Sequence, residues 1–204
     1  MTTRRSIVSL IGLTVMMSAA AAFTAPNQDV KAKVGEAAPN FTLKDASGKA
    51  HSLADYKGRI VVMQWINPDC PVCRRVSSSG LVATMAKELK GIDSNIVHLT
   101  VNSTSGMAAE KSAGYLKQNK IDAPALIDDD GTVGHMYGAM TTPHLFVIDA
   151  EGVLRYQGAF DDDPNGNKKD ATNYVVNAVQ QIKAGETVSP DYAKPYGCSV
   201  KYKK

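Results

Sequence analysis

The sequence contains only three cysteines among its 204 residues. Three cysteines cannot form the dense set of disulfides that holds a small secreted scaffold together. A structural zinc site would need a second cysteine pair or a downstream histidine pair, and the chain has neither. We therefore expect a domain that is held together by its hydrophobic core and that uses its cysteines for chemistry.

A large excess of charge of either sign is also missing. The chain has 23 basic and 20 acidic residues, which gives a formal net charge of +3. Two of the basic residues, Arg4 and Arg5, lie in an N-terminal segment that we expect to be removed. The near balance of charge that remains argues against nucleic acid, or an anionic membrane surface, as the main partner.

The first 25 residues have the pattern of a secretory signal peptide. Arg4 and Arg5 precede an apolar stretch that begins at Ile7, and the small residues 18–22 follow it. The alternative is a membrane anchor, but the apolar part is short for a span of about 20 residues. We predict that residues 1–25 are cleaved, that no stable membrane anchor remains, and that the protein is periplasmic or secreted.

Internal repeats and low-complexity linkers are absent, and predicted strands alternate with predicted helices along the rest of the chain. This order predicts one α/β domain over residues 26–187, followed by a C-terminal extension, residues 188–204, that carries Cys198. We expect a hairpin (40–43 with 50–53), a strand (60–66), a helix (71–90) ended by Gly91, a strand (95–101), a helix (107–119), a second hairpin (144–149 with 153–156) and a last helix (173–183) stopped by Gly185.

The pair Cys70 and Cys73 follows directly after the apolar strand, at the predicted start of a helix. The unpaired N–H groups and the dipole of a helix start favour a thiolate at the first cysteine, and Pro71 suits the first helical position. Arg74 and Arg75 add positive charge nearby. We predict that Cys70 is the more exposed and more acidic thiol and that Cys73 lies deeper, as in a dithiol–disulfide exchanger.

Four segments carry a family resemblance: residues 34–41, residues 53–58, the CPVC sequence at 70–73, and Thr142-Pro143. Over residues 34–183 the chain resembles the thioredoxin superfamily, and within it the extracytoplasmic redoxins that include peroxiredoxin-like and TlpA-like proteins. The resemblance implies a central mixed sheet with helices on both faces and an N-terminal β-hairpin extension. It also implies a cis peptide bond at Pro143 against the cysteines, and no cofactor.

The resemblance implies exchange of disulfides with protein thiols. Cys70 would open a partner's disulfide, Cys73 would release the partner, and Pro143 would shape the site beside Thr142. A second thiol protein, a reductant or an oxidant, would complete the cycle. Peroxiredoxins carry threonine or serine three residues before their reactive cysteine, where this chain has Asn67.

Cys198 and His144 leave alternatives open. Cys198 is a candidate third or resolving thiol, or else a small buried hydrophobe, and we predict that it lies close enough to the CPVC sequence to exchange with it. With Cys198 as resolving residue, the protein would be a peroxide-reducing redoxin. His144 would either face the thiols as a proton shuttle or be solvated. A copper chaperone holding the metal with two thiols and His144 is the least favoured alternative.

Other polar residues are expected to have no part in the site. The acidic turn at residues 161–166 matches the start of a calcium-binding loop, but its twelfth position is Thr172 in place of glutamate. We predict a solvated turn here. His51 and His98 are expected to be ordinary surface or edge residues.

Overall fold

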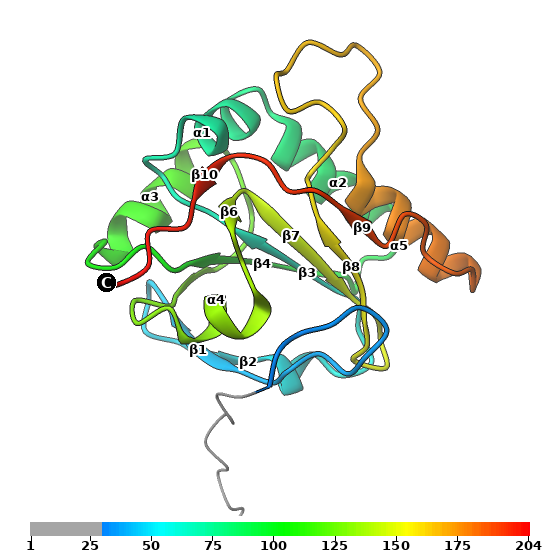
Figure 1. Ribbon diagram of the computed structural model, residues 1–204, viewed down its shortest axis with the longest axis horizontal. Helices are drawn as coiled ribbons and strands as arrows, with labels where there is room; N and C mark the ends of the chain where they lie inside the picture. Colours follow the sequence, from blue (N-terminus) through cyan, green and yellow to red (C-terminus); the bar gives the residue numbers. More distant parts are fainter. Residues whose placement is uncertain (1–29) are drawn as a thin grey trace, which may run out of the picture.

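The computed structural model describes residues 30–204, so the predicted signal peptide lies outside the described residues. These residues form an eight-stranded mixed sheet in the order β2-β1-β5-β4-β3-β7-β8-β9, with helices packed on both faces (Figure 1). Within this range no helix is both long and apolar enough to cross a bilayer.

The centre of the sheet is strand β3 (Val61–Trp65), which is buried along its whole length. It pairs in parallel with β4 (Val97–Asn102) and antiparallel with β7 (His144–Ile148). A strand covered on both faces needs apolar side chains on both, which explains the nearly unbroken apolar run in the sequence.

The remaining strands extend the sheet on either side of this centre. The predicted N-terminal hairpin is antiparallel and forms one edge, and the predicted hairpin of β7 with the following strand is also present. The strands are β1 (Thr42–Asp45), β2 (Ala50–Ser52), β5 (Ala125–Ile127), β8 (Leu154–Gly158) and β9 (Tyr192–Ala193).

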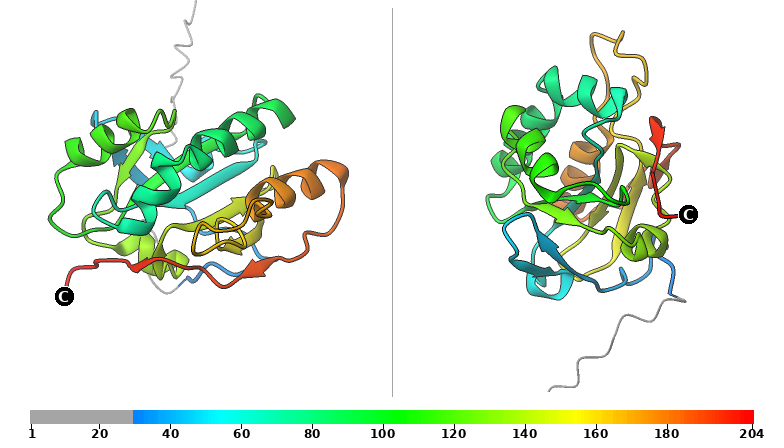
Figure 2. Two further views of the ribbon diagram at one scale, coloured as in Figure 1. Left: turned by 90° about the horizontal axis from the view of Figure 1, so that it is seen from above. Right: turned by 90° about the vertical axis from the view of Figure 1, so that its left-hand side faces the viewer.

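The sheet separates the core into two apolar layers, and helices cover each face (Figure 2). One face packs against α1 (Pro71–Ser78), α2 (Leu81–Ile92), α3 (Ala109–Gln118) and α5 (Tyr174–Ala184). The other packs against α4 (Thr132–Tyr137) and the short 3-10 helix η1 (Leu53–Tyr56).

The helix expected over residues 71–90 is in fact two helices. The chain breaks after α1 because Gly80 adopts a left-handed conformation, with φ of 82°, which glycine reaches without steric cost. Gly91, expected to end the helix, lies inside α2. The helix α4 was not predicted, since its six residues are too few to display a helical period.

The C-terminal extension follows a defined path over the molecule. It contributes β9, which pairs in parallel with β8, and then β10 (Cys198–Ser199), which pairs antiparallel with the short strand β6 (Thr141–Thr142). In Figure 1 it is the red segment that crosses the molecule between α1 and the end carrying α4. We call residues 196–202 the C-terminal strap.

Candidate active site

The two cysteines of the CPVC sequence lie at the N-terminus of α1. Cys70 is the N-cap residue in extended conformation, and Pro71 occupies the first turn, where its missing N–H leaves no bond unmade. A tight turn precedes the helix, since the Cys70 N–H donates to the carbonyl oxygen of Asn67 at 3.0 Å. The Cys70 Sγ in turn accepts a bond from the backbone N–H of Cys73 at 3.5 Å.

Pro143 lies beside this turn, and its peptide bond with Thr142 is cis. The Cys70 Sγ lies 3.0 Å from the carbonyl oxygen of Thr142, to which the thiol form donates a hydrogen bond. Thr142 is buried. The structure therefore brings together Cys70, Cys73, Thr142 and Pro143, all of which the sequence singled out.

The two thiols have opposite shifts in pKa. Hydrogen bonding by the Cys73 thiol is the main cause that lowers the pKa of Cys70 to about 4; burial opposes it, and Cys198, the Cys73 N–H and Thr142 add to it. Burial, and then the hydrogen bond to Cys70, raise the pKa of Cys73 well above its ordinary value. At neutral pH the reduced pair thus consists of a thiolate at Cys70 and a thiol at Cys73.

Cys70 is the more exposed of the two cysteines, as predicted, but both are buried. Cys70 is only 2% exposed and Cys73 is 0% exposed. The reason is the C-terminal strap, whose residues Tyr196 and Cys198 pack against the same apolar cluster as the two cysteines. No pattern in the sequence places a distant segment over the start of a helix.

Cys198 lies next to Cys70, in agreement with the prediction that it is close enough to exchange. In β10 it is the direct partner of Thr142, whose carbonyl oxygen lies 3.0 Å from the Cys70 Sγ, and it packs against the same apolar cluster as Cys70. Burial, and then hydrogen bonding with Cys70, raise the pKa of Cys198, so Cys198 is the protonated partner of the Cys70 thiolate. Unlike the other two cysteines, which are buried, Cys198 is partly exposed.

The two arginines do not act as expected. Arg74 is exposed, and Arg75 turns away from the thiols to donate to the carbonyl oxygen of Pro164 at 2.8 Å. The hydrogen bonds to its sulfur, rather than these charges, lower the pKa of Cys70. The partner of Arg75 is a carbonyl oxygen of a loop that is distant in the sequence, and the sequence alone does not reveal this contact.

His144 is neither solvated nor directed toward the thiols. It is buried, and its ring packs against Phe146, on the face of the sheet opposite α1. Its Nδ1 accepts a hydrogen bond from the Met140 N–H at 3.2 Å, and burial lowers its pKa to about 4. The side-chain period of a strand fixes this outcome, because His144 and Phe146 share a face while Leu145 points to the cysteines' side.

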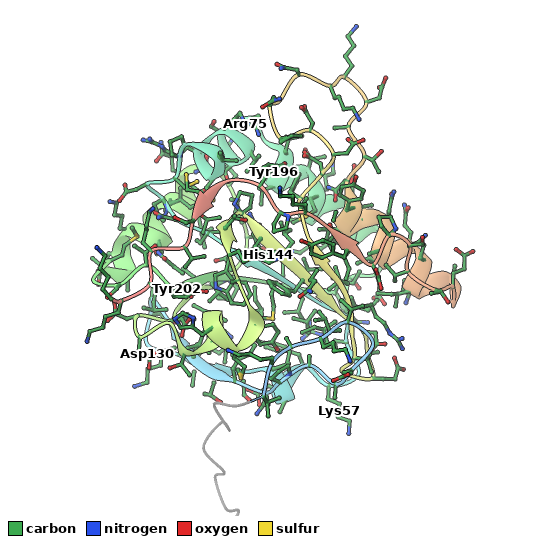
Figure 3. The ribbon with its side chains drawn as sticks, in the orientation of Figure 1. Lys57, Arg75, Asp130, His144, Tyr196 and Tyr202 are labelled. Atoms are coloured by element: carbon green, nitrogen blue, oxygen red, sulfur yellow. The ribbon has the colours of Figure 1, made fainter. Side chains whose placement is uncertain are left out.

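Two tyrosines that the sequence analysis did not select support the site. The Tyr115 hydroxyl donates to the carbonyl oxygen of Cys73 at 2.9 Å and lies 2.6 Å from the Ser77 hydroxyl, which fastens α1 to α3. Tyr196 of the strap donates to the carboxylate of Asp161. Figure 3 shows Tyr196 next to Arg75, with Tyr202 beside α4 at the other end of the strap.

The acidic turn is more ordered than the predicted solvated turn. Asp161 and Asp163 are both buried. The Asp163 carboxylate accepts the backbone N–H groups of residues 166–168, while Asp161 receives Tyr196. These bonds make the turn a support for the strap. His51 also differs from expectation, because it is buried between Tyr56 and Asp45, whereas His98 is half-buried and lies 3.2 Å from the Gln64 side-chain oxygen.

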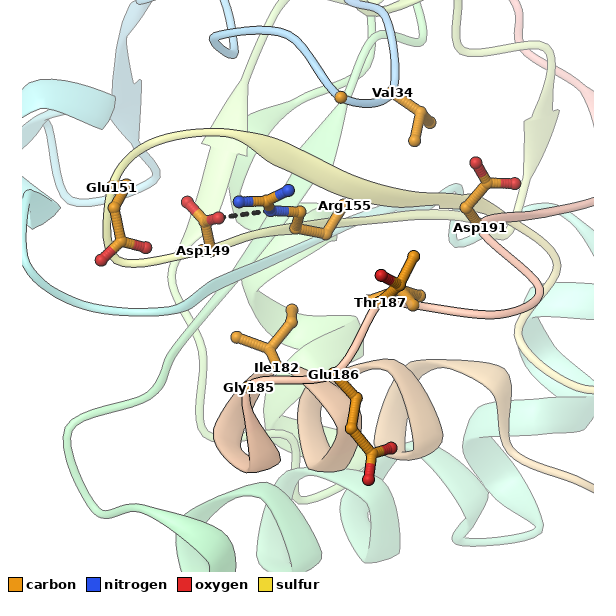
Figure 4. A pocket seen from close by; sticks show the side chains of 11 residues that line it. Val34, Asp149, Glu151, Arg155, Ile182, Gly185, Glu186, Thr187 and Asp191 are labelled. Atoms are coloured by element: carbon orange, nitrogen blue, oxygen red, sulfur yellow. Dashed lines mark hydrogen bonds and ion pairs between the residues drawn. The ribbon is translucent and has the colours of Figure 1, made fainter.

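A cavity elsewhere on the protein has no part in this site. It lies between the end of α5, the β7–β8 turn and Val34, and Arg155 forms an ion pair with Asp149 on its wall (Figure 4). The cavity borders the end of β7, which pairs with the start of β3. Cys70 follows the other end of β3, so the cavity and the cysteines lie at opposite ends of this strand. Over residues 30–204, no group of three histidine, cysteine or acidic side chains is placed to hold a metal ion.

Comparisons with known proteins agree with this geometry. The thioredoxin-like protein YneN of Bacillus subtilis is 29% identical over 133 residues, which cover 65% of this chain and 75% of YneN. The thiol-disulfide oxidoreductase ResA of Bacillus cereus is 29% identical over 126 residues, 62% of this chain and 69% of ResA. A crystal structure of the hypothetical protein SMc02350 from Sinorhizobium meliloti superposes with a TM-score of 0.75 at 28% identity, covering 84% of this chain and 95% of that one.

These similarities confirm a thioredoxin-like fold, with the central mixed sheet and helices on both faces that the sequence predicts. The profile of the AhpC/TSA family matches residues 34–157, which include β3, the cysteine pair and the β7–β8 hairpin. The chain is a thioredoxin-superfamily redoxin and belongs to the AhpC/TSA family.

Proposed function

We propose that this protein is a thiol–disulfide oxidoreductase that exchanges disulfides with protein thiols through Cys70 and Cys73. The observation that carries the proposal is the asymmetric protonation of the pair. A thiolate at Cys70 is the attacking species, and the neighbouring Cys73 holds the proton. The relationship to ResA, a thiol-disulfide oxidoreductase by name, supports the same chemistry.

The reaction proceeds in two exchanges. The Cys70 thiolate attacks a partner's disulfide, forms a mixed disulfide with one partner sulfur and releases the other as a thiolate. Cys73 then loses its proton and attacks Cys70, so that the Cys70–Cys73 disulfide forms and the second partner sulfur leaves. The carbonyl of Thr142, next to Pro143, lies beside the Cys70 sulfur and accepts a hydrogen bond from it only in the thiol form. A second thiol protein that acts as a reductant then returns the pair to the dithiol; where the exchange runs in reverse, an oxidant restores the disulfide.

An exported location is part of this proposal. The signal-like pattern of residues 1–25 supports it. Residues 26–187 would then form the redoxin domain and 188–204 its extension. Amino-terminal sequencing of the protein from a periplasmic or culture fraction should begin after residue 25; recovery of the uncleaved chain in the cytosol would contradict export.

Trapping of the mixed disulfide tests the exchange reaction. The double variant Cys73→Ser/Cys198→Ser should accumulate a disulfide between Cys70 and a short peptide with an internal disulfide, because neither neighbouring thiol remains to release the peptide. Cys70→Ser should form no such adduct and should lose insulin-disulfide reduction in the presence of dithiothreitol. Ser78→Ala, an exposed change on the same helix, serves as the control and should match the wild type. Full insulin reduction by Cys70→Ser would refute the proposal.

Peroxide reduction is a second candidate function. The observation in its favour is the contact of Cys198 with Cys70, which places a resolving thiol beside a thiolate. In this reaction Cys70 would be oxidised to a sulfenic acid, and Cys198 would condense with it to a disulfide and water. Peroxide consumption by the Cys73→Ser variant, lost on the further change Cys198→Ser, would support this reaction.

A further inference from the structure

The thiolate required by the proposed exchange is covered by the protein's own C-terminal strap. Cys70 is 2% exposed and Cys73 is 0% exposed, whereas Cys198 is partly exposed. Direct attack of Cys70 on a partner's disulfide therefore requires that the strap be lifted, because the partner sulfur must come into line with the Cys70 sulfur. Of the three cysteines, Cys198 is the one that is partly exposed.

The strap pairs with the site as an extended segment of a partner would. Cys198 and Ser199 lie antiparallel to Thr142 and Thr141, the residues just before Pro143. The Thr142 hydroxyl donates to the Cys198 carbonyl oxygen at 3.4 Å. This pairing places Cys198 beside Cys70, because the carbonyl oxygen of its strand partner Thr142 lies 3.0 Å from the Cys70 Sγ and Cys198 packs against the apolar cluster that contains Cys70.

A glycine before Cys198 makes this close pairing possible. Gly197 has φ of 129°, and a Cβ atom at this position would lie 2.2 Å from the carbonyl oxygen of Thr142. That oxygen is backbone and cannot move aside as a side chain can. Any side chain at position 197 would therefore push the strap away from Thr142, which provides a way to lift it without altering a cysteine.

The strap is fastened on both sides of Cys198. On one side, Tyr196 donates to the carboxylate of Asp161. On the other, the Val200 N–H donates to the carbonyl oxygen of Met140 at 3.0 Å, and the Tyr202 ring stacks on His135 with 3.9 Å between ring centroids. A loose tail would not be held at both ends, so the position of Cys198 is a built feature of the fold.

We propose that Cys198 is a third redox residue, through which the covered Cys70–Cys73 pair exchanges with thiols outside the protein. The inference rests on the proposed function of that pair. In the oxidised protein, the Cys198 sulfur attacks Cys70: the Cys70–Cys198 bond forms, the Cys70–Cys73 bond breaks, and the proton lost by Cys198 goes to Cys73. This step is an exchange within the chain and needs no oxidant.

An external thiol completes the reaction at the surface. It attacks Cys198, forms a mixed disulfide with it, and releases Cys70 as a thiolate. A second external thiol attacks the mixed disulfide, leaves with the first as their disulfide, and returns Cys198 to the thiol. Two external thiols are oxidised and the Cys70–Cys73 disulfide is reduced. Cys70 is a good leaving group because several hydrogen bonds stabilise its thiolate.

The first test asks which disulfide forms when Cys73 is absent. The full chain carrying Cys73→Ala is oxidised with glutathione disulfide, and its peptides are mapped without reduction. We expect a monomer with a Cys70–Cys198 disulfide in nearly every molecule. A product in which Cys70 carries glutathione, or joins two chains, while Cys198 stays a thiol would overturn the proposal.

The second test measures how fast reduced, unfolded ribonuclease reduces the oxidised protein. Cys198→Ser keeps the strap in place and should slow this reaction at least tenfold, whereas Ser199→Ala should leave it unchanged. Adding Gly197→Ala to Cys198→Ser should restore most of the rate, because the lifted strap exposes Cys70 directly. A wild-type rate in Cys198→Ser would overturn the relay.

The two proposals fail in different ways. If Cys70→Ser still exchanges with ribonuclease thiols at the wild-type rate, the proposed function is wrong. If Cys70→Ser is inactive and Cys198→Ser is fully active, the pair is the exchanger and only the relay is wrong. Far-ultraviolet circular dichroism of each variant verifies that it is folded before its rate is compared.

Discussion

At the scale of single residues, the chemistry of this protein depends on which of three neighbouring sulfurs carries the negative charge. Cys70 receives hydrogen bonds from Cys73, Cys198 and the backbone, whereas Cys73 lies deeper and remains protonated. The low pKa of Cys70 arises from these bonds at the start of α1. The adjacent arginines, which the sequence suggested as a cause, make other contacts: Arg75 donates to the carbonyl oxygen of Pro164, and Arg74 is exposed.

Titration of the reduced protein should show a thiolate at low pH. The pKa of Cys70 is lowered to about 4, so thiolate absorbance at 240 nm should rise by one thiolate equivalent as the pH increases through about 4. Cys73→Ala should move this step to higher pH, because the bond that lowers the pKa most is lost. Cys70→Ser is the control and should lack the step. A first thiolate that forms only above pH 8 would contradict the assignment.

The same shift has a consequence for stability. Because the pKa of Cys70 is lower in the folded than in the unfolded chain, the unfolded state binds more protons between about pH 4 and pH 9. The Cys70 contribution to the stability of the reduced protein should therefore be present at the upper end of this range and be lost as the pH falls toward 4. Urea unfolding of the reduced protein and of Cys70→Ser at several pH values measures the difference; equal pH slopes would refute the effect.

At the scale of elements, the site is a joint between helix α1, strand β6 and the C-terminal strap. Tyr115 ties α1 to α3 through the carbonyl of Cys73 and the hydroxyl of Ser77. The strap is tied to the molecule at Asp161 and again beside α4. Each tie is a hydrogen bond or a ring contact that can be removed by one substitution.

Tyr115→Phe should destabilise the protein by about 1 kcal/mol, because the buried carbonyl of Cys73 and the hydroxyl of Ser77 each lose a partner. Urea unfolding followed by circular dichroism measures the change. Tyr192→Phe is a matched control, since Tyr192 is exposed, and should leave the midpoint unchanged. Equal midpoints for the two variants would show that the Tyr115 hydroxyl contributes nothing.

Tyr202→Ala should loosen the end of the strap, because Tyr202 stacks on His135 and donates to the carbonyl oxygen of Ala139 at 2.6 Å. We expect faster hydrogen exchange at the amide of Val200, while the amides of β3 keep their protection. Lys203→Ala, an exposed change one residue further on, should leave the exchange as it is. Unchanged protection at Val200 in Tyr202→Ala would mean that the ring does not hold the strap.

At the scale of the whole molecule, much of the fold could be predicted from local patterns. The apolar run of β3, the two hairpins and the last helix follow from period and turn residues, and the C-terminal helix ends at Gly185 as expected. The cysteine pair and Pro143 could be identified because each occupies a short motif. The break at Gly80 could not, since glycine inside a helical pattern does not by itself end the helix.

The parts of the site that the sequence did not predict depend on contacts between distant segments. The closeness of Cys198 to the cysteine pair was predicted, but the pairing of residues 198 and 142, by which the strap covers Cys70, was not. The orientation of His144 depends on the register of β7 against β3, and a shift of one residue would direct the same side chain to the thiols. The buried acids of the 161–166 turn find their partners only in the folded chain. Contacts between residues that are distant in the chain do not produce a short motif in the sequence.

The most direct test of the central claim, that Cys70 and Cys73 form a dithiol–disulfide couple, is a redox titration of the full chain. The protein is equilibrated in glutathione buffers of defined ratio, quenched with acid, alkylated and analysed by mass spectrometry. We predict a single two-electron transition that involves Cys70, is abolished by Cys70→Ser, and has a midpoint less negative than about −270 mV, the value of thioredoxin, because hydrogen bonds stabilise the reduced Cys70. Cysteines that remain reduced at every ratio, or a transition that persists in Cys70→Ser, would contradict the account.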